Sequence, residues 1–375
     1  MLPVLPIGAT SSRPGGVAAF ASSRSAVGPS STSAGSHHGS HAHAPMPRAL
    51  HRSRGGAGSH RIAARRAAAR RVAAAAAMSK VAVTGATGFV GSELVKRLIA
   101  SGAEVQVLTR DKNAARAKIG NFSRVKYFAK ADWGDAIAGC DAVVNLAGEP
   151  ISTRWSAEVK QEILDSRVNT TRYVAQLINA CSEDKRPKVF VSSSAIGYYG
   201  TSESETFTED SAPGRDFLAT VCKDWEAAAN AASCGRIVNL RTGLVLASSG
   251  GVLEKMGPIF QLFLGGPIGE GEQWMSWIHR DDLVAMIIDA IADDACVGPV
   301  NGTAPNPVTM NAFCDTLGRV LGRPNWLPVP ELPLQLLLGE GAILVLEGQK
   351  VVPTKAPSSF QFSYPTLGKA LEKCY

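Results

Sequence analysis

Short apolar runs alternate along this chain with longer stretches in which apolar residues recur at helical spacing. Continuous apolar runs of about four to eight residues are typical of parallel strands that are buried on both faces of a sheet. The runs occupy residues 81–84, 105–108, 125–128, 142–146, 189–192, 237–240 and 299–301. Helices are predicted over residues 156–181, 217–232 and 282–292, the last with Asp281 as its N-cap. The alternation predicts an α/β fold, a Rossmann doubly wound parallel sheet of about seven strands.

Two segments interrupt this alternation and predict a second, smaller lobe. Residues 248–274 and 306–375 are richer in Gly and Pro, and we expect them to lie over the carboxyl ends of the strands on the substrate side. The predicted domains are a dinucleotide-binding Rossmann domain over 78–304, with 248–275 contributing to the substrate lobe, and a small C-terminal domain over 305–375. The most hydrophobic stretch, 332–346, contains Gln335 and Glu340, so it predicts a packed helix rather than a membrane span.

The first 77 residues differ in composition from the rest of the chain. They are rich in Ala, Ser and Gly and contain ten Arg but no Lys, Asp or Glu. This composition is typical of an organelle transit peptide, and we expect a disordered leader that directs the chain to the chloroplast, with the mitochondrion as second choice. The alanine tract before Met78 marks the expected processing region. The alternative is that Met78 is the true start and the preceding residues are a misassigned extension or a disordered tail.

Without the leader, the charge of the chain changes sign. Lys+Arg falls from 39 to 29 while Asp+Glu stays at 32, which gives 29 − 32 = −3, so the basic total does not indicate nucleic-acid binding. Six of the seven His lie in the leader, and the remaining His279 cannot form a cluster of histidine metal ligands. The seven Cys include no C-x-x-C pair, which fits a reducing compartment without structural disulfides or zinc.

A glycine motif directly follows the first predicted strand. Gly85, Gly88 and Gly91 have the spacing of a dinucleotide-binding turn, in which each glycine avoids a steric clash and the following helix N-terminus faces the diphosphate. Spacing alone is a weak signal, but the strand before the motif and the amphipathic helix after it support this interpretation. The expected cofactor contacts, including the small-residue turn after the fourth strand, are Gly85, Thr87, Gly88, Phe89, Val90, Gly91, Leu146, Ala147 and Gly148.

Arg110 indicates which dinucleotide is bound. A site for NAD places an acidic residue after the second strand to accept hydrogen bonds from the ribose 2′-hydroxyl, whereas this chain has Thr109 and Arg110 there. A guanidinium can pair with a 2′-phosphate, so we expect NADP(H) in preference to NAD(H). The alternative is that Arg110 is a solvated charge at a strand end.

Several longer motifs resemble a known family. They are residues 145–151 (Asn-Leu-Ala-Gly-Glu-Pro-Ile), 192–200 (Ser-Ser-Ser-Ala-Ile-Gly-Tyr-Tyr-Gly), 216–227, 273–282 and 353–365. Over residues 80–375 the chain resembles the extended NAD-dependent epimerase/dehydratase branch of the short-chain dehydrogenases/reductases, and within it the atypical "epimerase family protein" subgroup with a distinctive C-terminal domain. Plant members of this subgroup are described as giant-chloroplast or SulA-like chloroplast division proteins.

The resemblance implies a catalytic serine, a tyrosine and a lysine four residues after the tyrosine, which lowers the phenol pKa. Ser194 matches the serine, and Lys223 matches the lysine because it precedes Glu226 and begins an Ala-rich helix. The tyrosine position one turn earlier holds Ala219, whose methyl group cannot exchange a proton. The expected constellation is therefore incomplete.

Three groups are candidates for the missing proton donor. Tyr199, and less favourably Tyr198, follows Ser194 closely enough to reach the same pocket, although the two tyrosines could merely pack the turn. The others are Cys222, next to Lys223, and Glu149, which we expect at the nicotinamide end of the fourth strand. The predicted catalytic residues are Ser194, Tyr199 and Lys223, and Lys223 is also expected to bind the nicotinamide ribose unless it is a solvated helix lysine.

Other polar and aromatic residues have two interpretations each. Asn169 resembles the helix asparagine that supports the site, and we favour a structural role for His279. Trp155 and Trp274 either line the pocket or belong to the core. Arg167 and Arg241 either meet an anionic substrate or pair with nearby acids.

Two functional hypotheses follow from these observations. The first is an NADPH-dependent oxidoreductase or epimerase acting on an unknown small molecule. The second is a non-catalytic, cofactor-binding scaffold or assembly factor in the chloroplast, in the stroma or at the stromal face of the inner envelope. The expected partners are the nicotinamide dinucleotide and a small molecule but no nucleic acid, with homodimerisation and peripheral association with the envelope as further options.

Overall fold

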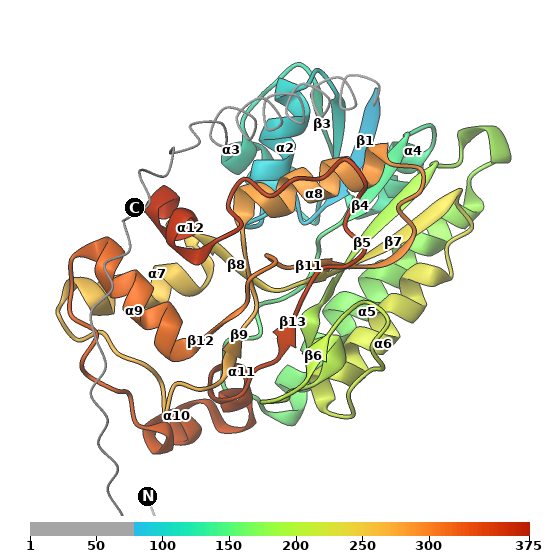
Figure 1. Ribbon diagram of the computed structural model, residues 1–375. Helices are drawn as coiled ribbons and strands as arrows, with labels where there is room; N and C mark the ends of the chain where they lie inside the picture. The colour runs from blue at the N-terminus through green and yellow to red at the C-terminus, as the bar shows by residue number, and fades with distance from the viewer. Residues whose placement is uncertain (1–78) are drawn as a thin grey trace, which may run out of the picture. The chain divides into compact units, whose positions relative to one another are not determined.

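A computed structural model describes residues 79–375 of the chain. The predicted transit peptide over residues 1–77 lies outside the described residues. Within residues 79–375, seven strands form one parallel sheet in the order β11-β7-β5-β4-β1-β2-β3, which confirms the predicted α/β Rossmann fold (Figure 1). In chain order the strands are β1 (Lys80–Thr84), β2 (Glu104–Leu108), β3 (Val125–Phe128), β4 (Ala142–Asn145), β5 (Val189–Ala195), β7 (Arg236–Thr242) and β11 (Gly298–Gly302).

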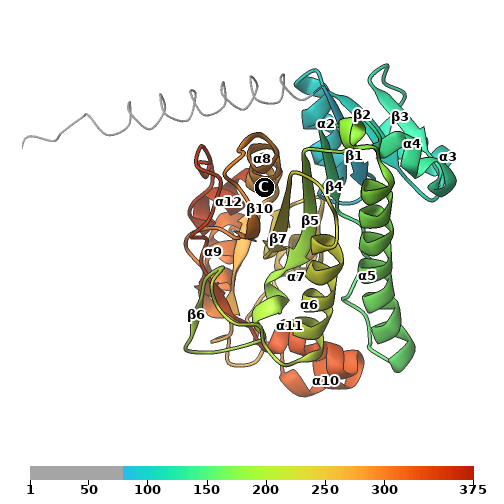
Figure 2. The same ribbon diagram turned by 90° about the vertical axis from the view of Figure 1, so that its right-hand side faces the viewer.

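Helices cover both faces of this sheet. One face packs against α2 (Gly91–Ala100), α3 (Lys112–Ile119) and α8 (Arg280–Ala292), and the other against α4 (Trp133–Ile137), α5 (Ala157–Ala180) and α6 (Phe217–Asn230). Figure 2 shows α5 and α6 on one side of the sheet and α8 on the other. Because both faces are buried, β1 reads as a continuous apolar run, with Val81, Ala82 and Val83 fully buried.

The N-cap of α8 differs from the prediction. The capping residue is His279, whose Nδ1 accepts a hydrogen bond from the backbone N–H of Asp281 at 3.1 Å. Asp281 lies in the first turn, and its carboxylate pairs with Arg97 of α2 at 3.1 Å. The prediction of Asp281 as the cap was wrong because a neutral imidazole can accept the same backbone hydrogen bond.

The two segments that interrupt the βα alternation share a second apolar core, and together with nearby short strands they form a region that we call the lobe. Its apolar core joins Leu253 and Phe260 to Phe313, Leu317 and Leu371, so residues from both segments share one core. The helices of this lobe are α7 (Gly251–Gln261), α9 (Met310–Leu321), α10 (Glu331–Leu338), α11 (Ile343–Leu346) and α12 (Leu367–Cys374). Its short strands, which pair as β10-β8, β12-β9 and β13-β6, are β6 (Thr206–Phe207), β8 (Leu244–Ala247), β9 (Trp274–Met275), β10 (Trp277–His279), β12 (Val308–Thr309) and β13 (Lys350–Val351). The predicted domain boundary at residue 305 stays a prediction.

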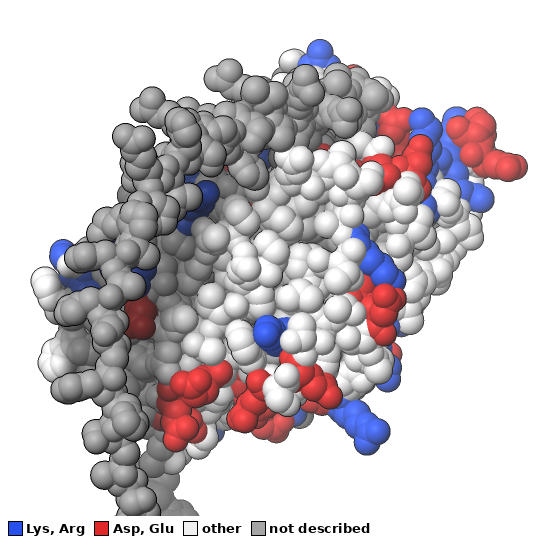
Figure 3. Space-filling view, in the orientation of Figure 1, with Lys and Arg blue, Asp and Glu red and all other residues white. Residues whose placement is uncertain are grey.

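Charges on the face seen in Figure 3 are mixed in sign. Where described atoms are visible, acidic and basic side chains lie mainly near the margins, and uncharged residues occupy the middle. No helix within residues 79–375 has the length and apolar character to cross a bilayer. All seven cysteines lie in this part of the chain, and none of them forms a disulfide.

Candidate active site

The glycine turn lies between β1 and α2, where the strand order reverses between β1 and β4. Gly85 has φ +63°, and a Cβ on it would lie 2.4 Å from the backbone oxygen of Leu146. A Cβ on Gly91 would lie 2.2 Å from the backbone oxygen of Gly85, so no larger residue lets the helix approach the strand this closely. Ligands of open α/β sheets bind in the crevice at such a reversal.

The remaining part of the turn is open toward solvent. Gly88 is exposed, and a Cβ on it would approach only the Gly85 oxygen, at 3.1 Å. Val90 precedes α2 without a side-chain hydrogen bond to the helix N-terminus. The ring of Phe89 packs toward Gly250, where an added Cβ would lie 2.5 Å from it. The turn therefore leaves space and backbone donors for an anion, and its residues fit a dinucleotide diphosphate.

Arg110 stands at the far side of the crevice, two residues after the end of β2. Its side chain is 85% exposed and pairs through Nη1 with Glu149 Oε1 at 3.2 Å. Glu149 was expected at the nicotinamide end of β4, but its carboxylate extends toward the end of β2 instead. In this position it neutralises the guanidinium that was predicted to meet a 2′-phosphate.

Ser194 lies near the end of β5 and belongs to a buried polar network. Its hydroxyl donates to Glu226 Oε1 of α6 at 2.7 Å, and Arg241 of β7 donates to both oxygens of the same carboxylate, at 2.8 and 2.9 Å. Of the two interpretations of Arg241, the structure therefore supports pairing with a nearby acid. The Glu226–Arg241 pair is 9% and 4% exposed at its side chains, so it links α6 to the sheet in a desolvated environment.

Tyr199 is bound into the same network. Its hydroxyl donates to Asn301 Oδ1 at 2.6 Å and accepts from Arg241 Nη1 at 3.1 Å, and only 3% of the residue is exposed. Burial raises the pKa of the phenol, although Arg241 opposes the shift. The ring of Tyr198 stacks under the Arg241 guanidinium, 3.4 Å from its Cζ. These contacts favour a packing role for both tyrosines over proton donation.

The residues of α6 that face the end of β5 are Leu218 and Cys222, each one position before the predicted Ala219 and Lys223. A Cβ on Gly197, just after β5, would lie 3.3 Å from Leu218 Cβ and 3.9 Å from Cys222 Sγ. Leu218, Cys222 and Glu226 follow one another at intervals of four residues, so they share a helix face. Ala219 is buried, but Lys223 is exposed, which does not support the roles predicted for it. The interval of four residues before Glu226 was the signal that could have identified Cys222.

Cys222 carries a neutral thiol in this site. Burial raises the pKa of its thiol to about 12, and the nearby Glu226 carboxylate acts in the same direction. The neighbouring Ser194 hydroxyl acts in the opposite direction. At pH 7 the position one turn after Leu218 therefore carries a protonated thiol rather than a charged amine.

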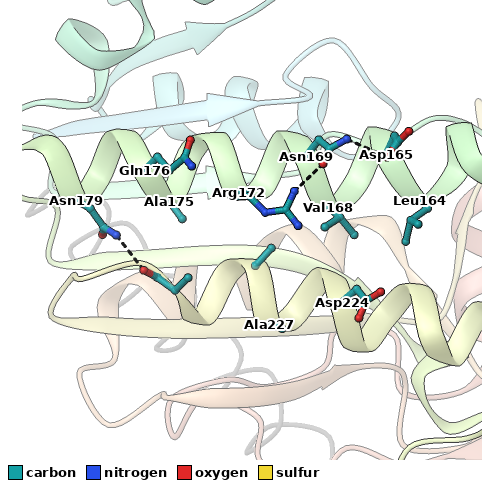
Figure 4. A pocket seen from close by; sticks show the side chains of 12 residues that line it. Leu164, Asp165, Val168, Asn169, Arg172, Ala175, Gln176, Asn179, Asp224 and Ala227 are labelled. Atoms are coloured by element: carbon teal, nitrogen blue, oxygen red, sulfur yellow. Dashed lines mark hydrogen bonds between the residues drawn. The ribbon is translucent and has the colours of Figure 1, made fainter.

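A corresponding difference concerns α5, where Arg167 rather than Asn169 faces the end of β4. Asn169 is exposed and contacts Asp165 and Arg172 at 2.9 and 2.7 Å. These three residues line a hollow of about 590 Å³ between α5 and α6 on the solvent side (Figure 4). Arg167 instead donates to the Glu149 backbone oxygen at 2.9 Å. The helical interval from buried Ile163 was the available signal for this inward position.

Trp155 packs in an apolar cluster, and Trp274 is bound by contacts with the lobe. Trp155 is 8% exposed, donates to the Ile151 oxygen at 2.9 Å and packs edge-on against Phe217, 5.4 Å between ring centroids. Trp274 donates to the Glu203 oxygen at 2.8 Å and lies under Lys350. Within residues 79–375 no group of three or more acidic, His or Cys side chains is arranged to hold a metal.

Comparisons with known proteins agree with this geometry. Residues 81–300 match the NAD dependent epimerase/dehydratase family, and residues 329–374 match a domain of unknown function, DUF1731. The chain is 50% identical over 297 residues to "Epimerase family protein SDR39U1 homolog, chloroplastic" of Arabidopsis thaliana, covering 78% of this chain and 85% of that protein. It is 41% identical over 298 residues to "Epimerase family protein YfhF" of Bacillus subtilis, covering 78% and 97%.

A solved structure shares the fold over the same region. The crystal structure of human epimerase family protein SDR39U1 (isoform 2) with NADPH is 36% identical and superposes with a TM-score of 0.71, covering 79% of this chain and 98% of that one. The glycine turn, the strand order and the C-terminal match therefore indicate the same family. The chain belongs to the NAD dependent epimerase/dehydratase family.

Proposed function

We propose that this protein binds NADP(H) in the crevice between β1 and β4 and uses it in an oxidoreductase or epimerase reaction on a small molecule. The observation that carries the proposal is the glycine turn, in which side chains at Gly85 and Gly91 would collide with backbone atoms. The human relative of known structure contains NADPH, which supports the same cofactor here.

The residues that would hold the cofactor come from three strand ends. The backbone of Gly85, Thr87, Gly88, Phe89, Val90 and Gly91 would receive the diphosphate, Arg110 the 2′-phosphate, and Leu146, Ala147 and Gly148 the sugar and nicotinamide side. When bound, the nicotinamide ring supplies a site that gives or accepts a hydride. Ser194 lies near the end of β5 and Cys222 on the side of α6 that faces this end, and we propose that they orient the reacting part of the substrate.

The cofactor preference is tested at the Arg110–Glu149 pair. Arg110→Asp should weaken NADPH binding at least tenfold, about 1.4 kcal/mol, because it replaces attraction of the 2′-phosphate by repulsion. Glu149→Gln should strengthen NADPH binding by a few-fold, because no carboxylate then competes for the guanidinium. Fluorescence titration with NADPH and NADH measures both effects, and Arg116→Gln on α3 serves as the matched control. Equal NADPH affinity in Arg110→Asp and the unchanged protein would contradict the proposed role of Arg110.

Catalysis itself is tested by single-turnover absorbance at the nicotinamide band with a library of carbonyl compounds. Hydride transfer with any member supports the reaction, and Ser194→Ala, Tyr199→Phe and Lys223→Ala then separate the predicted catalytic residues. NADPH binding without transfer to any substrate would count against it.

A non-catalytic, cofactor-binding scaffold is the second candidate, and one observation favours it. The two positions of α6 that face the end of β5 hold Leu218 and Cys222, so neither of these two positions supplies a phenol or an amine. If Ser194→Ala combined with Lys223→Ala abolished rescue of a chloroplast-size defect, while protein level and cofactor content stayed normal, the scaffold would be excluded.

We also propose that the protein acts in the chloroplast. The support is the composition of residues 1–77 and the name of the Arabidopsis relative, which calls that protein chloroplastic. Import into isolated chloroplasts, followed by N-terminal sequencing near Met78, tests this location. Plastid counts in a deletion line test the proposed role in chloroplast division. Membrane fractionation tests association with the inner envelope, and light scattering tests homodimerisation.

A further inference from the structure

Arg167 is held in a fixed position at the end of β4. Nη2 donates to the Glu149 backbone oxygen at 2.9 Å, and Nη1 donates to the Ile163 oxygen at 3.2 Å. The guanidinium also lies over the ring of Trp225, 5.4 Å from its centroid. A Cβ on Gly148 would lie 3.3 Å from Arg167 Cζ, so the guanidinium packs closely against this glycine.

The charge of Arg167 is not balanced by an acid. Within residues 79–375 no carboxylate lies within 4.0 Å of its guanidinium, whereas the more deeply buried Arg241 has two hydrogen bonds to Glu226. Backbone oxygens and a tryptophan ring fix the orientation of a guanidinium but leave its net charge unneutralised. Burial lowers the pKa of Arg167, while Cys222 and the Glu149 carboxylate, which forms no ion pair with it, act in the opposite direction. An arginine is always charged in proteins, so an anion would relieve this cost.

The location of Arg167 indicates which ligand would supply the anion. Its guanidinium packs against Gly148. The Cys222 thiol is near enough that the thiol and the guanidinium influence each other's pKa. Arg110, which suits the 2′-phosphate, follows β2, and its side chain reaches the Glu149 carboxylate from there. Between them, at the end of β1, is the glycine turn that suits the diphosphate. Arg167 is therefore on the side where the reacting part of the substrate would lie.

We propose that Arg167 binds an oxyanion of the small-molecule substrate, a carboxylate or a phosphate, beside Ser194 and Cys222. This inference rests on the proposed function, because it places the substrate next to the nicotinamide. A guanidinium in a fixed plane suits the two oxygens of a carboxylate or phosphate group, and a lysine cannot reproduce that geometry.

The test uses the full chain saturated with NADPH, so that the cofactor fills the other anion sites. Sodium phosphate and sodium malonate are titrated at constant ionic strength, with sodium chloride as the reference, and thermal unfolding is followed. At least one of the two anions should raise the melting temperature saturably, and the tighter of them identifies the class of oxyanion. Arg167→Gln should weaken that binding by about tenfold or more and leave NADPH affinity within about threefold. The matched control is Arg172→Gln, on the outer side of the same helix, which should behave as the unchanged protein.

Arg167→Lys keeps the proposal testable if Arg167→Gln fails to fold, because it retains the charge, and it too should bind the anion more weakly. The proposal is overturned if neither anion protects the unchanged protein more than chloride, or if both substitutions leave the protection intact. A tenfold loss of NADPH affinity in either variant would assign Arg167 to the cofactor diphosphate instead and also overturn it. Failure of the unchanged protein to bind NADPH, measured before any anion is added, would refute the proposed function separately from the role of Arg167.

Discussion

His279 shows how one buried side chain acquires a pH-dependent effect. Its ring lies 4.2 Å from that of Tyr364 between centroids, and its Nδ1 accepts the hydrogen bond that caps α8. Burial lowers the pKa of the imidazole from 6.5 to about 4, with the nearby Asp281 opposing the shift. The ring is therefore neutral at pH 7, which is the form that can accept a hydrogen bond. The structural role that we favoured for His279 agrees with these contacts.

We expect His279 to make the folded protein less stable in mild acid. Below pH 6.5 the unfolded chain takes up a proton that the folded chain refuses until about pH 4, so the free energy of unfolding falls as the pH is lowered through this window. The loss at pH 5 should be roughly 1–2 kcal/mol. His279→Asn, which retains a capping acceptor without a titratable ring, should remove this part of the change in urea denaturation at pH 7 and pH 5. An identical pH dependence in both proteins would refute this assignment.

At the scale of elements, the Glu226–Arg241 pair joins α6 to β7 and, through Ser194, to β5. All three side chains are buried, and the hydrogen bonds of Arg241 extend to Tyr199 in the turn after β5. A buried ion pair contributes little net free energy, but the loss of one partner leaves the other charge unpaired. The network therefore fixes how α6 lies on the sheet and with it the position of Cys222.

Arg241→Met should lower the free energy of unfolding by about 3–5 kcal/mol, because the Glu226 carboxylate is left buried without a counter-charge. Adding Glu226→Gln should restore part of this loss. Urea denaturation measures both changes. The control is Lys188→Met, which breaks the exposed pair between Lys188 and Asp141 and should cost less than about 1 kcal/mol. A similarly small cost for Arg241→Met would show that the buried network is not required for stability.

At the scale of the whole described molecule, Glu209 ties the C-terminal segment to the sheet. The residue is 3% exposed, and its carboxylate accepts from the backbone N–H groups of Asn301 in β11, Thr354 and Lys355 at 3.0, 3.0 and 3.1 Å. Residues 354 and 355 follow β13, which pairs with β6 just before Glu209. One carboxylate therefore joins three segments that are distant in sequence.

Glu209→Gln should loosen this connection, because one acceptor oxygen is replaced by an NH₂ group that faces the same N–H donors. Hydrogen bonds to a charged acceptor contribute about 1.5–3 kcal/mol each, so amide hydrogen exchange at Asn301, Thr354 and Lys355 should accelerate by about tenfold or more. Glu205→Gln, an exposed residue of the same segment, should leave the exchange unchanged. Unaltered protection in Glu209→Gln would mean that packing alone holds the segment.

Local patterns were sufficient for the elements but not for the orientation of every side chain. The apolar runs predicted all seven sheet strands because strands buried on both faces need continuous apolar residues. Lys223 and Asn169 are exposed, while Cys222 and Arg167 on the same helices turn inward, because a shift of one or two residues on a helix turns a side chain by about 100° or 200°. That rotation is set by packing, here by contacts such as Gly197 with Leu218 and Cys222.

The sequence by itself determined the Rossmann fold, the glycine turn and the position of Arg110 after β2, since each depends on residues that are neighbours in the chain. Only the tertiary structure decided that Arg241 is paired with Glu226, that Arg167 has no acidic partner among the described residues, and that Tyr199 is bound by Asn301. These contacts depend on which strands and helices meet, and they join residues that are distant in the chain, such as Tyr199 and Asn301, which are 102 positions apart.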